Sequence, residues 1–328
     1  MKISISILAV CLAQLTSAAP SFERRAVSGY NGVANSGWAT VKTGTTGGSG
    51  GTVTTVTTVA ALEAAIAGNA KKIVIISGTL TSTASEGLAL KPGSNTSILG
   101  ASGATLVNIG IRIINVSNVI VRGLKIQKVI APTDAIAIQK STFVWIDHNE
   151  LSADQDHDKD FYDGLLDITH AGDFITVSYN YLHDHWKGSL VGHSDSNSAE
   201  DTGHLLVSYH HNYFSNLNSR GPSFRFGTGH IYNNYYNALN DGINTRDGAQ
   251  LLVENNVFVD TGDAIYSTDA GFVVATGNDL GVGTNKALVG TIKPSDIPYS
   301  YTLDSIATVK SAVRAAAGAT ISFTSSQA

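Results

Sequence analysis

The chain has 328 residues, including 33 glycines and 6 prolines, and its 21 basic and 26 acidic residues give a formal net charge of −5 at pH 7. This acidity argues against nucleic acid as a partner, because a phosphate backbone selects positively charged surfaces. Beyond residue 25 no stretch is long and apolar enough to span a membrane. The length alone would suggest two globular domains, but repeat proteins escape that expectation.

The N-terminus is typical of a secreted protein. Lys2 precedes an apolar run over residues 3–15, and residues 17–19 are small. This pattern predicts a signal peptide over residues 1–19, which is too short to anchor the mature protein in a bilayer.

A short propeptide is expected over residues 20–25, because this segment ends in a dibasic pair. The mature chain, residues 26–328, would then carry a net charge of about −7. The only cysteine, Cys11, falls in the signal peptide. The mature protein should therefore hold no disulfide, and its stability must come from packing and hydrogen bonding.

Six segments along the chain alternate apolar and polar residues, and most of them end at an asparagine. They are residues 119–124, 144–149, 174–180, 206–212, 230–234 and 252–256. Their ends are separated by 25, 31, 32, 22 and 22 residues. A near-constant minimum with insertions is typical of a solenoid, in which each coil stacks only on its neighbours.

The recurring asparagines predict a ladder of side-chain amides that satisfy one another inside the coils. Ordinary turn-forming asparagines at strand ends are the alternative. We therefore expect an all-β fold, a single-domain right-handed parallel β-helix over residues 26–328.

Helical patterns occur only near the two ends of this domain. Residues 58–66 begin with a threonine cap and close at Gly68, and residues 304–317 have apolar residues at helical spacing. Short helices of this kind suit the open ends of a β-helix, where exposed strand edges need cover.

Three aspartates are candidates for a metal site. Asp163 and Asp167 precede one repeated segment, and Asp134 lies one coil earlier. Four residues of straight strand span about 13 Å, so the chain must bend for Asp163 and Asp167 to share an ion, and Gly164 permits a bend. Acids on stacked coils can converge on one hard cation. Isolated aspartates near turns are otherwise caps or solvated groups.

A second group of acids lies in residues 153–160. This loop lacks the glycine and the terminal glutamate of an EF-hand loop. We interpret it as a solvated loop that overhangs the site.

Three cations, Lys187, Arg220 and Arg225, follow the aspartates on later coils. In an acidic protein they would suit a substrate that carries carboxylates of its own. The alternative for Arg225 is an ion pair with an acidic residue inside the coil stack.

Several motifs at matching intervals resemble the pectate lyases of polysaccharide lyase family 1, especially secreted fungal enzymes. The resemblance covers about residues 110–260 and rests on Trp-Ile-Asp-His at 145–148, Asp-Gly-Leu-Leu-Asp at 163–167, Val-Ser-Tyr-Asn at 177–180, His-His-Asn-Tyr-Phe at 210–214, Arg-Gly-Pro-Ser-Phe-Arg at 220–225 and His-Ile-Tyr-Asn-Asn-Tyr at 230–235.

The resemblance assigns three roles: calcium ligands, a catalytic base and substrate-binding cations. These fall on Asp134, Asp163 and Asp167, on Arg220, and on Lys187 and Arg225, respectively. The implied activity is a calcium-dependent β-elimination that cleaves polygalacturonate, by an extracellular enzyme expected to be monomeric. The sequence departs from the common family form at Trp186 and Ser223, which affects subsite contacts rather than the base.

The assignment of Arg220 as the base rests on the resemblance, because a guanidinium group has a pKa above about 12 and is rarely neutral near pH 7. Three alternatives remain open at this point. A pectin lyase would act on methyl esters and lacks the calcium acids. A polygalacturonase-type glycoside hydrolase on the same fold would use Asp163 and Asp167 as general acid and base. A non-catalytic adhesin or carbohydrate-binding module would cleave nothing.

Overall fold

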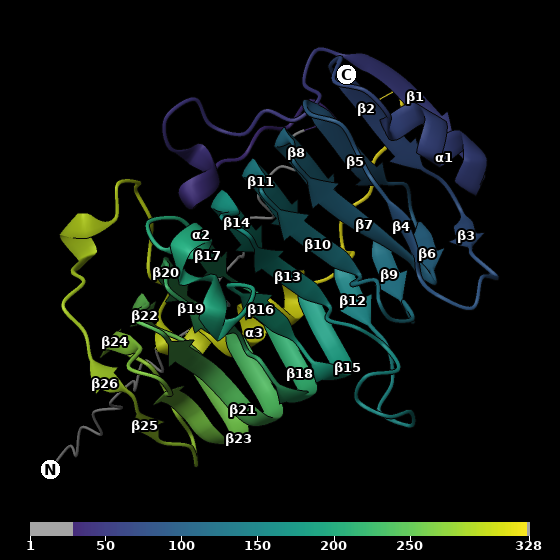
Figure 1. Ribbon diagram of the computed structural model, residues 1–328. Helices are drawn as coiled ribbons and strands as arrows, with labels where there is room; N and C mark the ends of the chain where they lie inside the picture. The colour runs from purple at the N-terminus through teal and green to yellow at the C-terminus, as the bar shows by residue number, and fades with distance from the viewer. Residues whose placement is uncertain (1–28, 327–328) are drawn as a thin grey trace, which may run out of the picture.

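The computed structural model describes residues 29–326, so the expected signal peptide and propeptide lie outside the described residues. The chain winds into a parallel β-helix whose strands stack from β1 and β2 at one end to β25 and β26 at the other (Figure 1). Every pairing between named strands is parallel, and the described residues form one continuous stack. The predicted all-β solenoid is confirmed.

Each coil contributes strands to three faces, which we call faces A, B and C. Face A consists of β1 (Thr52–Val56), β2 (Lys72–Ile76), β5 (Thr96–Gly100), β8 (Ser117–Arg122), β11 (Thr142–Asp147), β14 (Asp173–Ser178), β17 (Leu206–His210), β20 (Thr228–Tyr232), β22 (Gln250–Glu254), β24 (Phe272–Thr276) and β26 (Leu288–Val289). Face B consists of β3 (Thr79–Thr81), β6 (Thr105–Val107), β9 (Lys125–Gln127), β12 (Glu150–Ser152), β15 (Tyr181–Lys187) and β18 (Tyr213–Ser219).

Face C consists of β4 (Leu88–Leu90), β7 (Ile109–Ile114), β10 (Ile136–Gln139), β13 (Leu166–Thr169), β16 (Ser189–Val191) and β19 (Ser223–Arg225). Faces B and C merge in the later coils, where β21 (Tyr235–Arg246) pairs with both β18 and β19 and continues to β23 (Val257–Ser267) and β25 (Asn285–Lys286). The outer side of face C carries most of the predicted site.

The strand register of face A reproduces the sequence spacing. Val119 pairs with Val144 and Val144 with Ile175, and Ser208 pairs with His230 and His230 with Leu252. Equivalent residues therefore stack in columns along the helix axis, about 4.8 Å from one coil to the next.

The predicted asparagine ladder is present and runs through Asn149, Asn180, Asn212, Asn234, Asn256 and Asn278. Each Nδ2 donates to the Oδ1 of the next member at 2.9–3.1 Å. The same amide also donates to a backbone carbonyl, as Asn212 does to Val177 at 2.9 Å. The ladder therefore satisfies its own polar groups, which are fully buried from Asn149 to Asn256.

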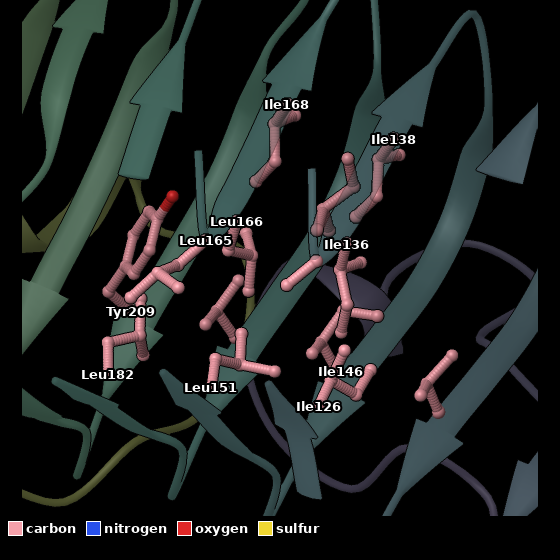
Figure 2. Close-up of a cluster of buried hydrophobic side chains, with 14 of the residues drawn as sticks. Ile126, Ile136, Ile138, Ile146, Leu151, Leu165, Leu166, Ile168, Leu182 and Tyr209 are labelled. Atoms are coloured by element: carbon pink, nitrogen blue, oxygen red, sulfur yellow. The ribbon is translucent and has the colours of Figure 1, made fainter. Parts of the chain in front are cut away.

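The interior is a continuous apolar column filled by all three faces. Alternation along each strand sends one residue in and the next out, so that Leu166 and Ile168 of β13 are buried inside. Figure 2 shows side chains from successive coils in this interior, among them Ile126, Ile136, Ile138, Ile146, Leu151, Leu182 and Tyr209. The same alternation places Asp167 and Thr169 on the outer side of β13.

Helices are few in the described part of the chain: η1 (Trp38–Thr40), α1 (Val59–Ile66), η2 (Asp195–Asn197), α2 (Ser198–Asp201), η3 (Pro294–Asp296) and α3 (Ile306–Ala316). No helix among residues 29–326 is long and apolar enough to cross a membrane.

The two predicted helices are α1 and α3, and they take different places. The Thr58 side chain accepts a hydrogen bond from the Ala61 N–H at 3.2 Å, and α1 packs beside β1 and β2 at the N-terminal end, as expected. The apolar side of α3 instead packs along the flank of the stack, where Val309 and Val313 cluster with Tyr235.

Candidate active site

The predicted metal acids and the predicted base line one pocket on the outer side of face C. Its volume is about 300 Å³, and its walls include Asp134, Asp163, Asp167 and Arg220. These residues come from three separate coils, because β10 pairs with β13, β13 with β16 and β16 with β19. Coil stacking therefore brings together side chains that lie up to 86 residues apart in the sequence.

Backbone amides orient two of the three carboxylates. The Gly164 N–H donates to Asp134 Oδ1 at 2.8 Å, and the Leu190 N–H donates to Asp167 Oδ1 at 3.0 Å. Each bond fixes one oxygen and leaves the second oxygen of the same carboxylate for another partner. The second oxygen of Asp167 lies 3.8 Å from Arg220 Nη1.

The electrostatics of this cluster are unfavourable for the carboxylates as they stand. Burial and the neighbouring charges of Asp167 and Asp163 raise the pKa of Asp134 well above its usual range. Burial also raises the pKa of Asp167 to about 6, although the Arg220 guanidinium opposes this effect. A group of partly buried like charges is an arrangement that a bound cation would relieve.

The donor set fits a hard divalent cation. It consists of carboxylate oxygens from adjacent coils, which are the ligands that Ca²⁺ prefers. Among residues 29–326, no group of three or more His, Cys, Asp or Glu side chains is arranged closely enough to hold a metal ion. The fit therefore rests on ligand chemistry and on the shared pocket of Asp134, Asp163 and Asp167.

Gly164 is required for space rather than for an unusual backbone angle. A Cβ at this position would lie 2.6 Å from Asp167 Oδ1 and 2.8 Å from its carboxyl carbon. The carboxylate of Asp167 thus lies against Gly164, where any larger residue would collide with it.

Lys187 lies at the end of β15, beside the acids. Its Nζ is 3.3 Å from Asp163 and 3.3 Å from Asp160 of the acidic loop. Its backbone N–H donates to His185 Nδ1 at 2.8 Å, and burial together with the Lys187 charge lowers the pKa of His185 to about 4. A neutral His185 ring therefore helps to fix the strand end that carries Lys187.

The acidic loop over residues 153–160 does overhang the site. Its residues are mostly exposed at the tip, and Trp186 Nε1 donates to the His157 carbonyl at 2.8 Å. Besides Asp160, which reaches Lys187, the loop carries Asp154, which binds the Tyr162 hydroxyl at 3.0 Å. The hydrogen bond of Trp186 therefore helps to hold this loop in place.

Arg225 is placed differently from the other predicted residues. Its Nε lies 2.6 Å from Asp195 and 3.2 Å from Asp247, and its side chain is 10% exposed. It does not line the pocket of Arg220. The ion pair that the sequence left open for Arg225 is therefore present, with Asp195 supplied by the insertion between β16 and β17.

Sequence reasoning did not single out Arg112, Gln139 and His193, which also line the pocket. Arg112 lies between buried Ile111 and Ile113, so the alternation alone identifies it as outward-facing on β7. Nothing in its neighbouring residues distinguishes it from an ordinary surface arginine.

Comparison with known proteins identifies the family. The pectate lyase family model matches residues 25–327. The probable pectate lyase A of Neosartorya fischeri is 52% identical over 330 residues, covering 98% of this chain and 100% of the relative. The pectate lyase A of Aspergillus niger is 53% identical over 289 residues, covering 88% of each chain.

A solved pectate lyase from a Bacillus species, in complex with trigalacturonate, superposes with a TM-score of 0.75 at 32% sequence identity, covering 87% of this chain and 98% of that one. A pectate lyase variant from Xanthomonas campestris gives a TM-score of 0.77 at 28% identity, covering 87% and 98%. Together with the coil-by-coil assembly of the acids and Arg220, these matches show that the chain belongs to the pectate lyase family.

Proposed function

We propose that this protein is a secreted, monomeric, calcium-dependent enzyme that cleaves polygalacturonate by β-elimination. The observation that carries the proposal is the shared pocket of Asp134, Asp163, Asp167 and Arg220. The elimination requires a bound cation close to a base, so the presence of these four residues in one pocket supports the proposal. The complex of the related Bacillus enzyme with trigalacturonate supports the substrate class.

The reaction removes the proton on C5 of a galacturonate residue, which is α to the C6 carboxylate. The C5–H electron pair forms the C4–C5 double bond, the C4–O bond breaks, and the departing oxygen takes up a proton. Charge builds on the C6 carboxylate as C5 loses its proton, so catalysis depends on positive charge held near that group.

Asp134, Asp163 and Asp167 would hold Ca²⁺, which when bound acts as a Lewis acid toward the substrate carboxylate. Arg220 would accept the C5 proton, and its 30% exposed side chain reaches the pocket from the β18–β19 connection. Lys187 would exchange its contacts with Asp160 and Asp163 for a substrate carboxylate. Arg225 would bind substrate only after release from Asp195.

The test measures the ultraviolet absorbance of the unsaturated product formed from polygalacturonate, with chelator and after Ca²⁺ is restored. We expect chelation to abolish product formation and Ca²⁺ to recover it. Full activity in strong chelator would overturn the assignment of the three aspartates. Asp167→Asn should raise the Ca²⁺ concentration needed for half-maximal rate.

The alternatives differ in product and in substrate. A glycoside hydrolase releases reducing ends without ultraviolet absorbance, and a binding module releases neither. A pectin lyase would act on methyl esters as well as or better than on free acid. We expect highly methylated pectin to be a poorer substrate than polygalacturonate, because Ca²⁺ and Lys187 both act on a free carboxylate.

A further inference from the structure

Arg112 is held in a fixed orientation at one side of the active-site pocket. It projects from the outer side of β7, between two buried isoleucines. Its Nε and Nη2 donate to Gln139 Oε1 at 3.0 and 2.7 Å. Gln139 lies on the next coil, in β10, so one amide oxygen fixes the plane of the guanidinium.

The charge of Arg112 is not neutralised by the protein. Across residues 29–326, Gln139 is its only hydrogen-bonding partner, and no carboxylate forms an ion pair with it. The cations deeper in the site differ, because Lys187 and Arg220 each lie near an aspartate. A guanidinium that is oriented by a neutral amide and faces a pocket is suited to a carboxylate ligand.

The strand register places Arg112 in line with the metal acids. Arg112 pairs with Ala137, and Ala137 pairs with Asp167. Three successive coils therefore carry these residues in one outer column, with Arg112 about 10 Å from Asp167 along the stack. Ala137 is small, so the column does not obstruct an extended chain that runs from one to the other.

We propose that Arg112, positioned by Gln139, forms a subsite for the carboxylate of a galacturonate residue remote from the cleaved bond. This inference rests on the proposed function and deepens it, because it makes Arg112 a determinant of chain-length preference. A substrate long enough to reach from Arg220 past Asp167 to Arg112 gains this contact, and a shorter one does not.

The test compares kcat/KM for oligogalacturonates from trimer to octamer in wild type, Arg112→Gln, Arg112→Lys and Gln139→Ala. For Arg112→Gln we expect a loss of about ten-fold on the long oligomers, mainly through KM, and a smaller loss on the shortest ones. The kcat/KM of Arg112→Lys on long oligomers should lie between those of wild type and Arg112→Gln, since lysine keeps the charge without the planar fork of the guanidinium. Gln139→Ala should raise KM on long oligomers while kcat is retained.

Lys125→Gln is the matched control, because this exposed cation lies on face B and pairs with Glu150. If Arg112→Gln lowers kcat/KM by the same factor at every chain length, or at none, the proposed subsite is overturned. Calorimetric binding of the octamer to Arg220→Lys protein, with and without Arg112→Gln, provides a readout that needs no turnover. Unchanged affinity there overturns the subsite, whereas absence of unsaturated product from wild type overturns the proposed function alone.

Discussion

Two groups of polar side chains, the asparagine ladder and the acidic cluster, lie on the same coils and behave in opposite ways. The asparagine ladder lies inside the coil stack, where each amide is both donor and acceptor to its neighbours. The acidic cluster of Asp134, Asp163 and Asp167 lies outside, where burial and the neighbouring negative charges raise the pKa values of Asp134 and Asp167. The amides of the ladder satisfy one another, whereas the carboxylates of the acidic cluster repel one another.

This difference follows from the chemistry of the repeated group. A side-chain amide complements an identical amide one coil away, so repetition stabilises the stack. A carboxylate repels an identical carboxylate, so repetition is tolerable only where solvent or a bound cation can intervene. Changes in the ladder should therefore affect stability, and changes outside should affect turnover.

The largest effect is expected for Arg220→Lys. If Arg220 removes the C5 proton, this change should lower kcat by about a thousand-fold, because general-base catalysis and its geometry are both lost. Affinity for polygalacturonate and the unfolding midpoint should stay close to wild type, since the interaction matters mainly in the transition state.

Arg225→Lys is the comparison variant for this experiment, because Arg225 lies in β19, the strand directly after Arg220, but outside the pocket. It should change KM more than kcat. An Arg220→Lys enzyme that keeps more than about a tenth of wild-type kcat, equal to about 1.4 kcal/mol of barrier, would mean that another group is the base.

Asn212→Ala should have the next largest effect, and on stability instead. The change removes the hydrogen bonds from Asn212 to Val177 and Asn234 and those it accepts from Asn180. Buried amides left without partners should lower the free energy of unfolding by about 3 kcal/mol, measured by denaturant unfolding.

The exposed Asn240 provides the control for the ladder. Its Nδ2 donates to Asn218 Oδ1 at 2.7 Å, which is the same amide pair at the surface. Asn240→Ala should change stability by no more than about 0.5 kcal/mol. Equal effects at both positions would mean that burial of the ladder is not what makes it stabilising.

A smaller effect on stability, which depends on pH, is expected from the acidic cluster when the protein is kept in chelator. Burial raises the folded-state pKa of Asp167 to about 6, from the ordinary value of 3.8 for an aspartate. Its ionisation therefore destabilises the fold above about pH 6, and this penalty fades as the pH falls toward 4. Asp167→Asn should be more stable than wild type by about 2 kcal/mol at pH 7 to 8, and the advantage should vanish near pH 4.

Addition of Ca²⁺ should make wild type more stable than Asp167→Asn at neutral pH, because only wild type retains all three carboxylates. Thermal unfolding of both proteins between pH 4 and 8, with and without Ca²⁺, measures the effect. A stability difference that does not change with pH would contradict the raised pKa of the buried Asp167 carboxyl group.

The sequence predicted the asparagine ladder and the grouping of the acids on neighbouring coils because both depend on the coil repeat. Spacings of 22 to 32 residues fix which strands stack, and alternation within β13 decides that Asp167 faces outward. The repeat also predicts that Asp134 lies one coil before Asp163, whereas the role of Arg220 was implied by the family resemblance. What lies off the repeat was not predictable in the same way.

Two features show this limit. The amphipathic pattern of α3 indicates that one side packs, but it does not specify that the partners are Tyr235 and Val257 on the flank. Asp195 belongs to the insertion between β16 and β17, whose path is set by contacts distant in sequence. Its pairing with Arg225 could therefore be named only as an unspecified alternative.

The smallest expected effect concerns this pairing. Asp195 Oδ1 lies 2.6 Å from Arg225 Nε and 3.0 Å from Arg246 Nη2, so one protein carboxylate bridges two cations on adjacent coils. If a substrate carboxylate competes for Arg225, Asp195→Asn should lower KM for polygalacturonate by about two- to three-fold, which is the range for one exposed ion pair. Asp269→Asn is the matched control, because Asp269 pairs with Arg246 at 3.1 Å but has no ion pair with Arg225. An unchanged KM in Asp195→Asn, together with lowered stability, would show that Arg225 does not bind the substrate. The role of Arg225 would then be structural, because its ion pair with Asp195 would serve to hold the insertion in place.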